Sequence, residues 1–305
     1  MSEIWYMTKR NCLVYLRDKS AVFFSFLTML IVLGLMVIFL GSMNSENILT
    51  VLDTYGWEGR DTSQDARNAA YLIQLWTLAG ILMVNSVTVT LTVMGAMVQD
   101  ETRKRVMAFY VTPVKRYKLT LGYVFSAWLI GIGMCILTLA AGEIWFAAQG
   151  FALLPIQSLC KLCGMIVLNC FTFSAIGHVL ALFIHSDSAW GGLLTIIGTL
   201  VGFAGGIYLP MNSLAEPVQK ILKLLPFLHG ASMMRVVFTR EAVLTTFSGF
   251  PEEFTDVFDV EMGSVIVLGE HTFSIHEQVL FLLFYAIIAI VAATIVNQNR
   301  KLKDR

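Results

Sequence analysis

Few residues of this chain have the types and spacing that catalysis or metal binding requires. Cys160 and Cys163 lie one helical turn apart, but without a second pair of ligands they are typical of packed thiols rather than of a zinc site. His276 and Glu277 begin like the helix of a zinc protease, yet the second histidine of that motif is replaced by Leu280. The sequence therefore predicts neither a catalytic residue nor a metal site.

Two isolated ionisable residues fall inside long apolar runs. Glu143 lies near the end of one run, where a carboxylate is inexpensive, although a proton-relay role stays open. His178 follows Ser174 by four positions, which favours a hydrogen-bonded packing histidine. The chain also has no G-x-x-x-x-G-K-[ST] phosphate-binding loop, so an ATP-driven activity requires a separate ATP-hydrolysing subunit.

The composition is that of a membrane protein. Hydrophobic residues make up 57% and charged residues 14% of the 305 positions, and the mean hydropathy is +0.73. Soluble domains carry roughly a quarter charged residues. The formal net charge of +0 does not by itself bear on nucleic-acid binding, but for a membrane protein of this kind we expect no nucleic-acid partner. Because residues 1–20 already hold six charged side chains, we expect no cleavable leader.

Six apolar runs are long enough to cross a bilayer, whose hydrocarbon core requires roughly 20 helical residues. They cover residues 21–41, 72–98, 119–147, 156–184, 189–209 and 279–296. With the N-terminus inside, the inner segments 1–20, 99–118 and 297–305 hold four, six and four of the 21 Lys and Arg residues, as the positive-inside rule requires. The sequence thus predicts an all-α membrane protein with six transmembrane helices and both termini in the cytoplasm.

The charged inner loop of residues 99–118 reads QDETRKRVMAFYVTPVKRYK. Asp100 and Glu101 open it, an apolar set follows, and Pro113 biases Thr112 away from helical geometry. The apolar set is Val106, Met107, Phe109, Tyr110 and Val111. This pattern is typical of a short surface helix that sits in a groove of another protein. It is also consistent with a positive-inside anchor that touches only lipid headgroups.

The remaining segments flank the spans. Residues 1–20 place Glu3, Arg10 and Arg17 on one helical stripe, which predicts an interfacial helix. Residues 42–70 are expected to be a polar outer connection. Three prolines break the first half of the outer segment 206–278 and favour two short re-entrant or interfacial helices near 213–224 and 227–238. Arg235 would snorkel from the second of these to the headgroups, and the acidic part, 241–278, would hold a small β-hairpin in SVIVLGEHTF.

Over nearly the whole chain these features resemble the membrane subunit of ABC type-2 exporters. In that family the loop between the second and third spans typically has acidic residues, a Gly-Thr pair, an apolar helix and then Thr-Pro-Val with a basic residue. Asp100, Glu101 and the run from Val111 to Arg116 match, whereas Thr102 to Arg105 do not supply the Gly-Thr pair. GGIYLPMNSLAEP and LLPF match the proline-broken outer segment of the family, with Leu225 where Asn is common.

The resemblance implies the permease subunit of an exporter in a bacterial plasma membrane, moving an amphipathic, drug-like, peptide or lipid-linked substrate outward. It implies a separate ABC ATPase subunit that binds ATP and Mg²⁺, and a second permease chain, identical or different. The coupling contact to the ATPase would be made by Asp100, Glu101, Val106, Met107, Phe109, Tyr110 and Pro113. The alternatives are an ATP-independent secondary carrier or channel and, as a third class, an intramembrane enzyme.

Two further sets of residues have candidate roles within the membrane. One set recurs at helical spacing in the second run: Asn85, Thr88, Thr92 and Gln99. Such polar groups line a transport path, or they hydrogen-bond a neighbouring helix at about 0.6 kcal/mol each. The other set repeats every four residues in the fifth run: Gly198, Gly202 and Gly206. This spacing indicates close helix packing, within the chain or between two permease chains.

Overall fold

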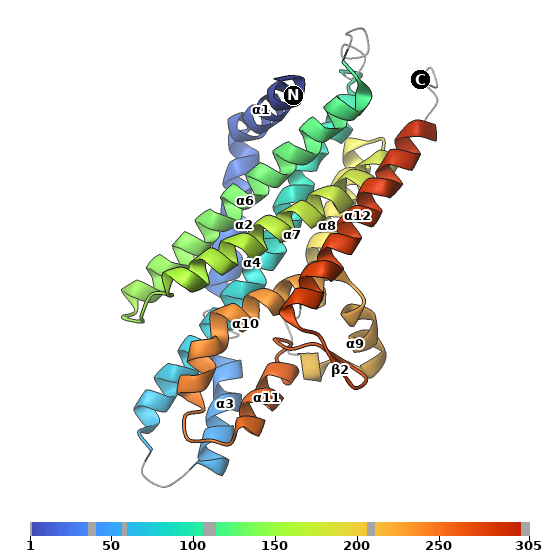
Figure 1. The fold of residues 1–305 in the computed structure, drawn as a ribbon. Coiled ribbons are helices and arrows are strands. Elements are labelled where there is room, and N and C mark those ends of the chain that lie inside the picture. The colour runs from blue at the N-terminus through green and yellow to red at the C-terminus, as the bar shows by residue number, and fades with distance from the viewer. Residues whose placement is uncertain (1, 36–40, 57–59, 106–113, 206–210, 300–305) are drawn as a thin grey trace.

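A computed structural model gives the fold and describes residues 2–35, 41–56, 60–105, 114–205 and 211–299 (Figure 1). The longer helices are α1 (Ser2–Arg17), α2 (Lys19–Leu35), α3 (Gly41–Tyr55), α4 (Thr62–Thr102), α6 (Arg116–Ala148), α7 (Ile156–Phe183), α8 (Asp187–Ala204), α10 (Pro226–Thr246) and α12 (Ile275–Asn299). The shorter elements are η2 (Met211–Ser213), α9 (Glu216–Lys223), α11 (Glu252–Glu261), β1 (Val267–Leu268) and β2 (His271–Thr272).

Five helices are long and apolar enough to cross a membrane, and they coincide with the second to sixth predicted spans: α4, α6, α7, α8 and α12. The bent pair α9 and α10 would raise the number to six if it counts as one broken span. The first predicted span, 21–41, corresponds to α2, which the structure describes over 17 residues, and residues 36–40 of that run lie outside the described residues. The described chain is thus predominantly helical, as predicted, with five or six candidate spans.

Helix α4 lies at the centre of the bundle, with α6, α7, α8 and α10 packed around it (Figure 1). Of its most apolar stretch, 78% is buried inside the molecule. Glycines let α6 approach it closely. A Cβ on Gly131 would lie 2.6 Å from Thr90 Cγ2, and one on Gly142 would lie 2.4 Å from Leu78 Cδ2. A displacement of either end of α4 must therefore displace its neighbours, because packed side chains leave little free space.

The prediction of a polar connection over residues 42–70 is wrong. Gly41–Tyr55 forms helix α3, and its Ile48 and Leu52 are buried against Leu72 and Ile73 of α4. Ile48 and Leu52 are four positions apart, so they lie on one face of the helix and form an apolar stripe within an otherwise polar segment. The prediction of a loop came from the glycines and polar residues that follow α3, among them Gly56, Arg60 and Asp61.

The segment between α8 and α12 contains the predicted short helices and the predicted hairpin. Pro217 and Pro226 lie in the first turns of α9 and α10, where the missing N–H costs nothing. The two helices meet at 84°, and α10 is 21 residues long, longer than the predicted 227–238. The hairpin pairs Val267 with Thr272 in antiparallel register.

The two ends of the molecule differ in content (Figure 1). One end holds α1, the junction between α4 and α6, and the last turns of α12; we call it the α1 end. The other holds α3, the start of α4, and α11; we call it the α11 end. Helix α1, predicted over residues 1–20, lies along the start of α6, where a Cβ on Gly122 would be 2.5 Å from Met7 Cγ.

Candidate functional site

At the α1 end three helices meet around one carboxylate. Asp100, in the last turn of α4, is 3% exposed. Arg10 of α1 forms a two-point ion pair with it, of which the Nη2 to Oδ1 contact measures 3.0 Å. Tyr123 of α6 donates its hydroxyl to Asp100 Oδ2 at 2.7 Å. We call Arg10, Asp100 and Tyr123 the Asp100 cluster, and it ties α1, α4 and α6 together.

The charges of this cluster are mutually satisfied. The hydrogen bond to Asp100 raises the pKa of Arg10, although partial burial of the guanidinium acts in the opposite direction. Arg105 adds a second cation 3.7 Å from Asp100 Oδ1. A buried carboxylate is tolerated when it is paired and hydrogen-bonded in this way. Asp100 therefore faces the interior of the α1 end rather than an open surface.

The neighbouring residues tie the α4 terminus to the turn between α7 and α8. Glu101 lies 3.4 Å from His185 Nδ1, and Arg103 lies 4.0 Å from Asp187. Thr102 donates its hydroxyl to the carbonyl oxygen of His185 at 3.3 Å. On the other side of the loop, Lys118 forms an ion pair with Glu3 of α1, and its hydrogen bond lowers the pKa of Glu3.

The stem of the 99–118 loop is therefore fixed to α1, α6 and the start of α8. The other predicted coupling residues lie outside the described residues: Val106, Met107, Phe109, Tyr110 and Pro113. The cations around the stem are exposed: Lys9, Arg17, Lys19, Arg103, Lys104, Arg105 and Lys115. The sequence singled out Asp100 as a coupling residue, but its pairing with Arg10 spans 90 positions and had no local signal.

The four path candidates on α4 do not share one environment. Asn85 is buried, and its side-chain amide donates to Thr138 Oγ1 of α6 at 2.9 Å. This is the hydrogen bond to a neighbouring helix that was the alternative to lining a transport path. Thr88 and Thr92 are half-buried and donate to carbonyl oxygens one turn back in their own helix. Gln99 is exposed at the α1 end. A role in lining a path stays a prediction for these residues.

The glycines of α8 also differ from one another. A Cβ on Gly198 would meet no atom of the described chain within 4 Å, Gly202 is buried, and Gly206 lies outside the described residues. The close approach of α8 to α4 is made elsewhere, at Gly95, where a Cβ would lie 2.7 Å from the indole nitrogen of Trp190. Only 22% of the apolar stretch of α8 is buried inside the molecule.

A second polar centre lies between α4, α8, α10 and α11. Arg235 is fully buried, so the prediction that it snorkels to the headgroups is wrong. Its Nη2 donates to the carbonyl oxygen of Gly205 at 2.7 Å and its Nη1 to that of Met262 at 3.3 Å. Gly205 and Met262 cap the C-termini of α8 and α11, where a cation is favourable.

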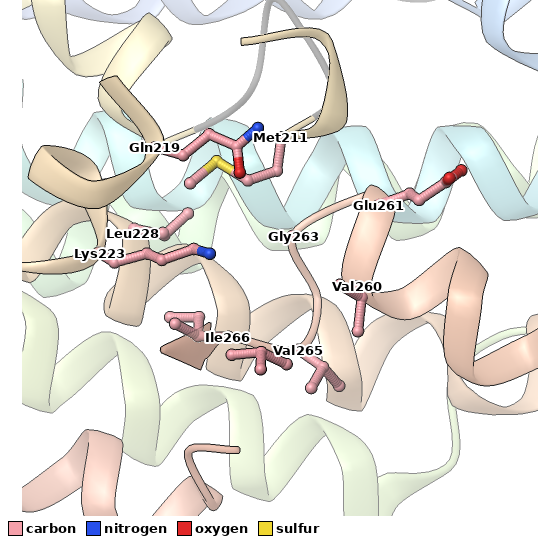
Figure 2. Close-up of a pocket in the computed structure, with 10 residues that line it drawn as sticks. Met211, Gln219, Lys223, Leu228, Val260, Glu261, Gly263, Val265 and Ile266 are labelled. Carbon is pink, nitrogen blue, oxygen red and sulfur yellow. The ribbon is translucent and has the colours of Figure 1, made fainter. Parts of the chain in front are cut away.

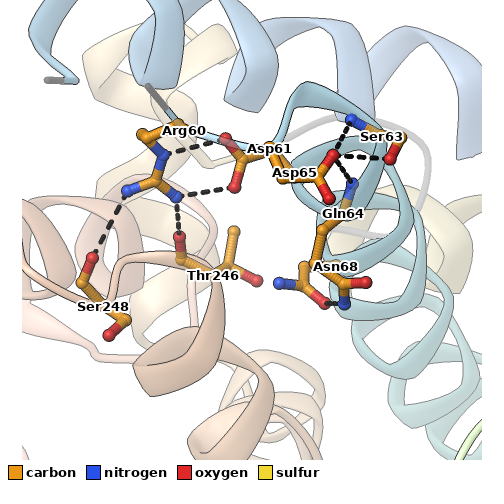
Figure 3. A network of polar contacts seen from close by, with 8 residues as sticks. All are labelled: Arg60, Asp61, Ser63, Gln64, Asp65, Asn68, Thr246 and Ser248. Atoms are coloured by element: carbon orange, nitrogen blue, oxygen red, sulfur yellow. Dashed lines mark hydrogen bonds and ion pairs between the residues drawn. The ribbon is translucent and has the colours of Figure 1, made fainter. Parts of the chain in front are cut away.

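A third polar group fixes the α11 end (Figure 3). Arg60 binds Asp65 with both nitrogens of one edge, Nε to Oδ2 at 2.8 Å and Nη2 to Oδ1 at 2.7 Å. It also donates to the carbonyl oxygens of Thr246, the last residue of α10, and of Ser248 just beyond the helix, at 3.3 Å each. Asp61 caps the start of α4 by accepting from the backbone N–H groups of Ser63 and Gln64.

The remaining chemistry-bearing residues have local partners or do not gather. Glu143 accepts from the backbone N–H of Leu154 at 3.1 Å, which joins the last part of α6 to the connection just before α7. Within the described residues, no three His, Cys, Asp or Glu side chains come together as metal ligands. The site that the structure presents is therefore mechanical: a helix junction at the α1 end and two arginine centres nearer the α11 end.

Comparison with known proteins identifies the family of the chain. The family model described as ABC-2 family transporter protein matches residues 49–296, which is most of the sequence. The curated proteins searched gave no match to this chain. The matched region contains every candidate span from α4 to α12 and the stem of the 99–118 loop. The chain therefore belongs to the ABC-2 transporter family, and it is a multi-pass membrane permease of an ABC transporter.

Proposed function

We propose that this permease exports an amphipathic substrate, of drug-like, peptide or lipid-linked type, across a bacterial plasma membrane. A separate ABC ATPase subunit, which binds ATP and Mg²⁺, supplies the energy from the cytoplasmic side. The α1 end faces the cytoplasm in this proposal, because its exposed Lys and Arg residues follow the positive-inside rule. The chain itself performs no hydrolysis.

The observation that carries the proposal is the Asp100 cluster. The ATPase would contact the loop between α4 and α6, whose stem begins at Asp100 and ends beside Lys118. A displacement of that stem reaches α1 and α6 through Arg10 and Tyr123, and it reaches the rest of the bundle through buried α4. The loop is therefore mechanically connected to the spans that would have to move.

Transport then follows from a change in the relative stability of two helix arrangements. Binding of ATP to the partner favours one arrangement, and hydrolysis favours the other. The equilibrium between the two arrangements of the permease shifts only as far as the partner's binding affinities for those arrangements differ. A second permease chain, identical or different, completes the path. The poorly covered faces of α8 and α12, each with 22% of its apolar stretch buried, are available to lipid and to that chain.

The test is co-purification of the chain with an ATPase subunit. Changing Met107, Phe109 and Tyr110 together to glutamate should abolish the association, because a charged face cannot enter an apolar groove. The matched control is Leu244→Glu, an exposed apolar residue of α10 near the α11 end, which should leave the association intact. Movement of solute by the purified chain without any nucleotide-hydrolysing partner would instead establish the carrier or channel alternative.

A further inference from the structure

We propose that the cavity beneath the elbow of α9 and α10 binds the anionic head of an amphiphile, a single negative charge carried on an apolar chain. The cavity has a volume of 240 Å³ and is bounded by α9, α10, the end of α11 and β1 (Figure 2). Its walls are mostly apolar: Met211, Leu228, Val260, Val265 and Ile266. Lys223 is the cation among its lining residues.

Lys223 is turned toward this cavity. Figure 2 shows its side chain extending from the end of α9 into the space above Ile266 and Val265. Lys223 is half-buried, and no carboxylate of the described chain lies within ion-pair distance of its ammonium. Lys220, three positions earlier on the same helix, is 72% exposed and pairs with Glu216 at 3.9 Å. The two lysines of α9 therefore have different surroundings.

The other polar groups of the cavity are less suited to bind a ligand charge. Gln219 donates its side-chain amide to the carbonyl oxygen of Leu214 at 2.8 Å, which fixes its orientation. Glu261 lines the opposite side, and Figure 2 shows its carboxylate directed away from Lys223. An ammonium beside apolar walls attracts an anion more strongly than it would in water, because the local dielectric is lower. The Glu261 carboxylate repels the same anion, so removal of its charge should strengthen binding.

Helix α9 places this cavity at a boundary between apolar and polar surroundings. Ile221 and Leu224 are 60% and 56% exposed, Val218 is exposed beside them, and Glu216 and Lys220 are exposed as well. A short helix with exposed apolar and charged residues of this kind suits the membrane–water interface. Leu222 is buried with Met211, Leu228 and Ile266 in one apolar cluster that joins α9 to the cavity walls. An amphiphile in the interface has its head and the start of its chain at this depth.

The size of the cavity sets how much of the ligand it holds. Sites for drug-sized molecules measure roughly 300–1,000 Å³. A volume of 240 Å³ therefore admits a head group and the first methylenes, while the rest of the chain remains in lipid. The ligand is either a resident anionic lipid or a molecule that the transporter moves. Only the second case rests on the proposed function.

The experiment uses the full chain in nanodiscs of phosphatidylcholine and two photoreactive probes with the same diazirine-bearing chain. One probe is an alkyl sulfate and the other is the uncharged alcohol. We expect the sulfate to label peptides within 211–228 and 260–267, and the alcohol to label them about tenfold less, the effect of one charge-assisted contact. Equal labelling by both probes would overturn the proposal.

Substitutions then assign the charge. Lys223→Gln should lower sulfate labelling about tenfold, whereas Lys223→Arg should restore it. Lys220→Gln is the matched control on the same helix and should change nothing, and Glu261→Gln should increase labelling. An equal loss in Lys220→Gln and Lys223→Gln would show attraction to surface charge alone and would refute the site.

A second arm identifies the source of the ligand without deciding whether the site exists. With the ATPase subunit reconstituted, a transported amphiphile accelerates ATP hydrolysis, and Lys223→Gln reduces that acceleration. A resident lipid leaves the hydrolysis rate unchanged while labelling persists. Because labelling needs no nucleotide, failure of the site and failure of the proposed ATP-driven export give different results.

Discussion

Trp76 and Arg235 meet in the interior, with the guanidinium carbon 4.3 Å from the centre of the indole ring. Both side chains donate to the same acceptor, the carbonyl oxygen of Met262, Trp76 from Nε1 at 2.9 Å and Arg235 from Nη1 at 3.3 Å. The pair thus joins α4 and α10 to the C-terminus of α11. Since Arg235 also reaches Gly205, the end of α8 belongs to the same unit.

Removal of this guanidinium should loosen the α11 end. We expect Arg235→Met to lower the free energy of unfolding by on the order of 2 kcal/mol, because the carbonyl oxygen of Gly205 loses its side-chain donor, that of Met262 keeps only Trp76, and the cation–π contact is lost. Arg240→Met, at an exposed position of the same helix, is the control and should stay within about 0.5 kcal/mol of the parent. Thermal unfolding in nanodiscs measures both, and equal stability of the two variants would contradict the assignment.

Trp76→Phe tests the indole hydrogen bond separately from the stacking of the aromatic ring on Arg235. Phenylalanine keeps an aromatic face for Arg235 but loses the Nε1 hydrogen bond to Met262. We expect a loss of about 1 kcal/mol, smaller than that of Arg235→Met. Hydrogen exchange should show the change at residues 262–265, whose backbone N–H groups are bonded to the last turn of α11. Faster exchange spread uniformly over the chain would argue against a local effect.

The contribution of the Asp100 cluster to the free energy of unfolding should depend on its charges and not only on the shape of its side chains. Asp100→Asn keeps the side-chain volume but leaves Arg10 without its ion-pair partner, so we expect a destabilisation on the order of 2 kcal/mol. Asp187→Asn breaks a more exposed, 4.0 Å contact with Arg103 and should cost less than about 1 kcal/mol. A double-mutant cycle of Asp100→Asn with Arg10→Gln, followed by thermal unfolding, measures the coupling. Additive effects would mean that the two residues do not act as a pair.

The sequence predicted five of the candidate spans, α4, α6, α7, α8 and α12, because an apolar run of about 20 residues suits few structures other than a membrane-spanning helix. It predicted less well where two segments distant in sequence meet. Arg10 and Asp100 were each noticed, one on a polar stripe and one at the end of an apolar run, but nothing local paired them. Arg235 was assigned to the headgroups because a lone arginine on a short outer helix usually reaches water. Its actual partners are backbone carbonyls of Gly205 and Met262, which carry no side-chain signature.

The glycine predictions show the same limit. A repeat of small residues marks where a helix can approach something, but it does not identify what. Gly198 has open space beside it within the described chain, whereas the close contact of α8 uses Trp190 against Gly95. Gly95 belongs to no repeat of small residues, since the other glycine of α4 is Gly80, fifteen positions earlier. The glycine at which two helices approach closely is determined by the bulky side chain that faces it, and that side chain belongs to the other helix.

Gly95→Ala should therefore be costly. The new Cβ would lie 2.7 Å from Trp190 Nε1, so α4 and α8 must move apart or the indole must turn. We expect a loss of roughly 1–3 kcal/mol, typical of overpacking. Trp190→Leu in the same chain should recover part of it by making room. Thermal unfolding of the two single variants and the double variant decides this, and a neutral Gly95→Ala would show that the contact is looser than described.

Gly198→Ala tests the contact between permease chains. Within the chain the added methyl group meets nothing, so the stability of the isolated permease should stay within about 0.5 kcal/mol of the parent. If α8 packs against a second permease chain at this position, the variant should lower the fraction of dimers measured by cross-linking in nanodiscs. Gly164→Ala, at another open position on α7, is the control and should leave the dimer fraction unchanged. Unchanged dimerisation in both variants would remove Gly198 from the contact.

The α11 end should respond to pH through Asp259. Burial, with a smaller contribution from Asp256, raises the pKa of Asp259 to about 6. The unfolded pKa of an aspartate is about 3.9, so the folded state binds more protons than the unfolded state between about pH 4 and 6. The free energy of unfolding therefore falls as pH rises through this window, by on the order of 2 kcal/mol for this group. Above that window the charged carboxylate is a net cost to the fold.

Asp259→Asn should remove this cost. The variant should be more stable than the parent at pH 7.5 and nearly equal to it at pH 4, because the folded carboxyl is then protonated and the unfolded one is only about half ionised, so little of the cost remains. Asp256→Asn should give a smaller gain, since it removes only the lesser contribution. The measurement is hydrogen exchange at Ser264 and Val265, whose N–H groups donate to the Asp259 carbonyl oxygen, taken as a ratio of variant to parent at each pH. A ratio that does not change between pH 4 and 7.5 would mean that Asp259 titrates as an ordinary exposed aspartate.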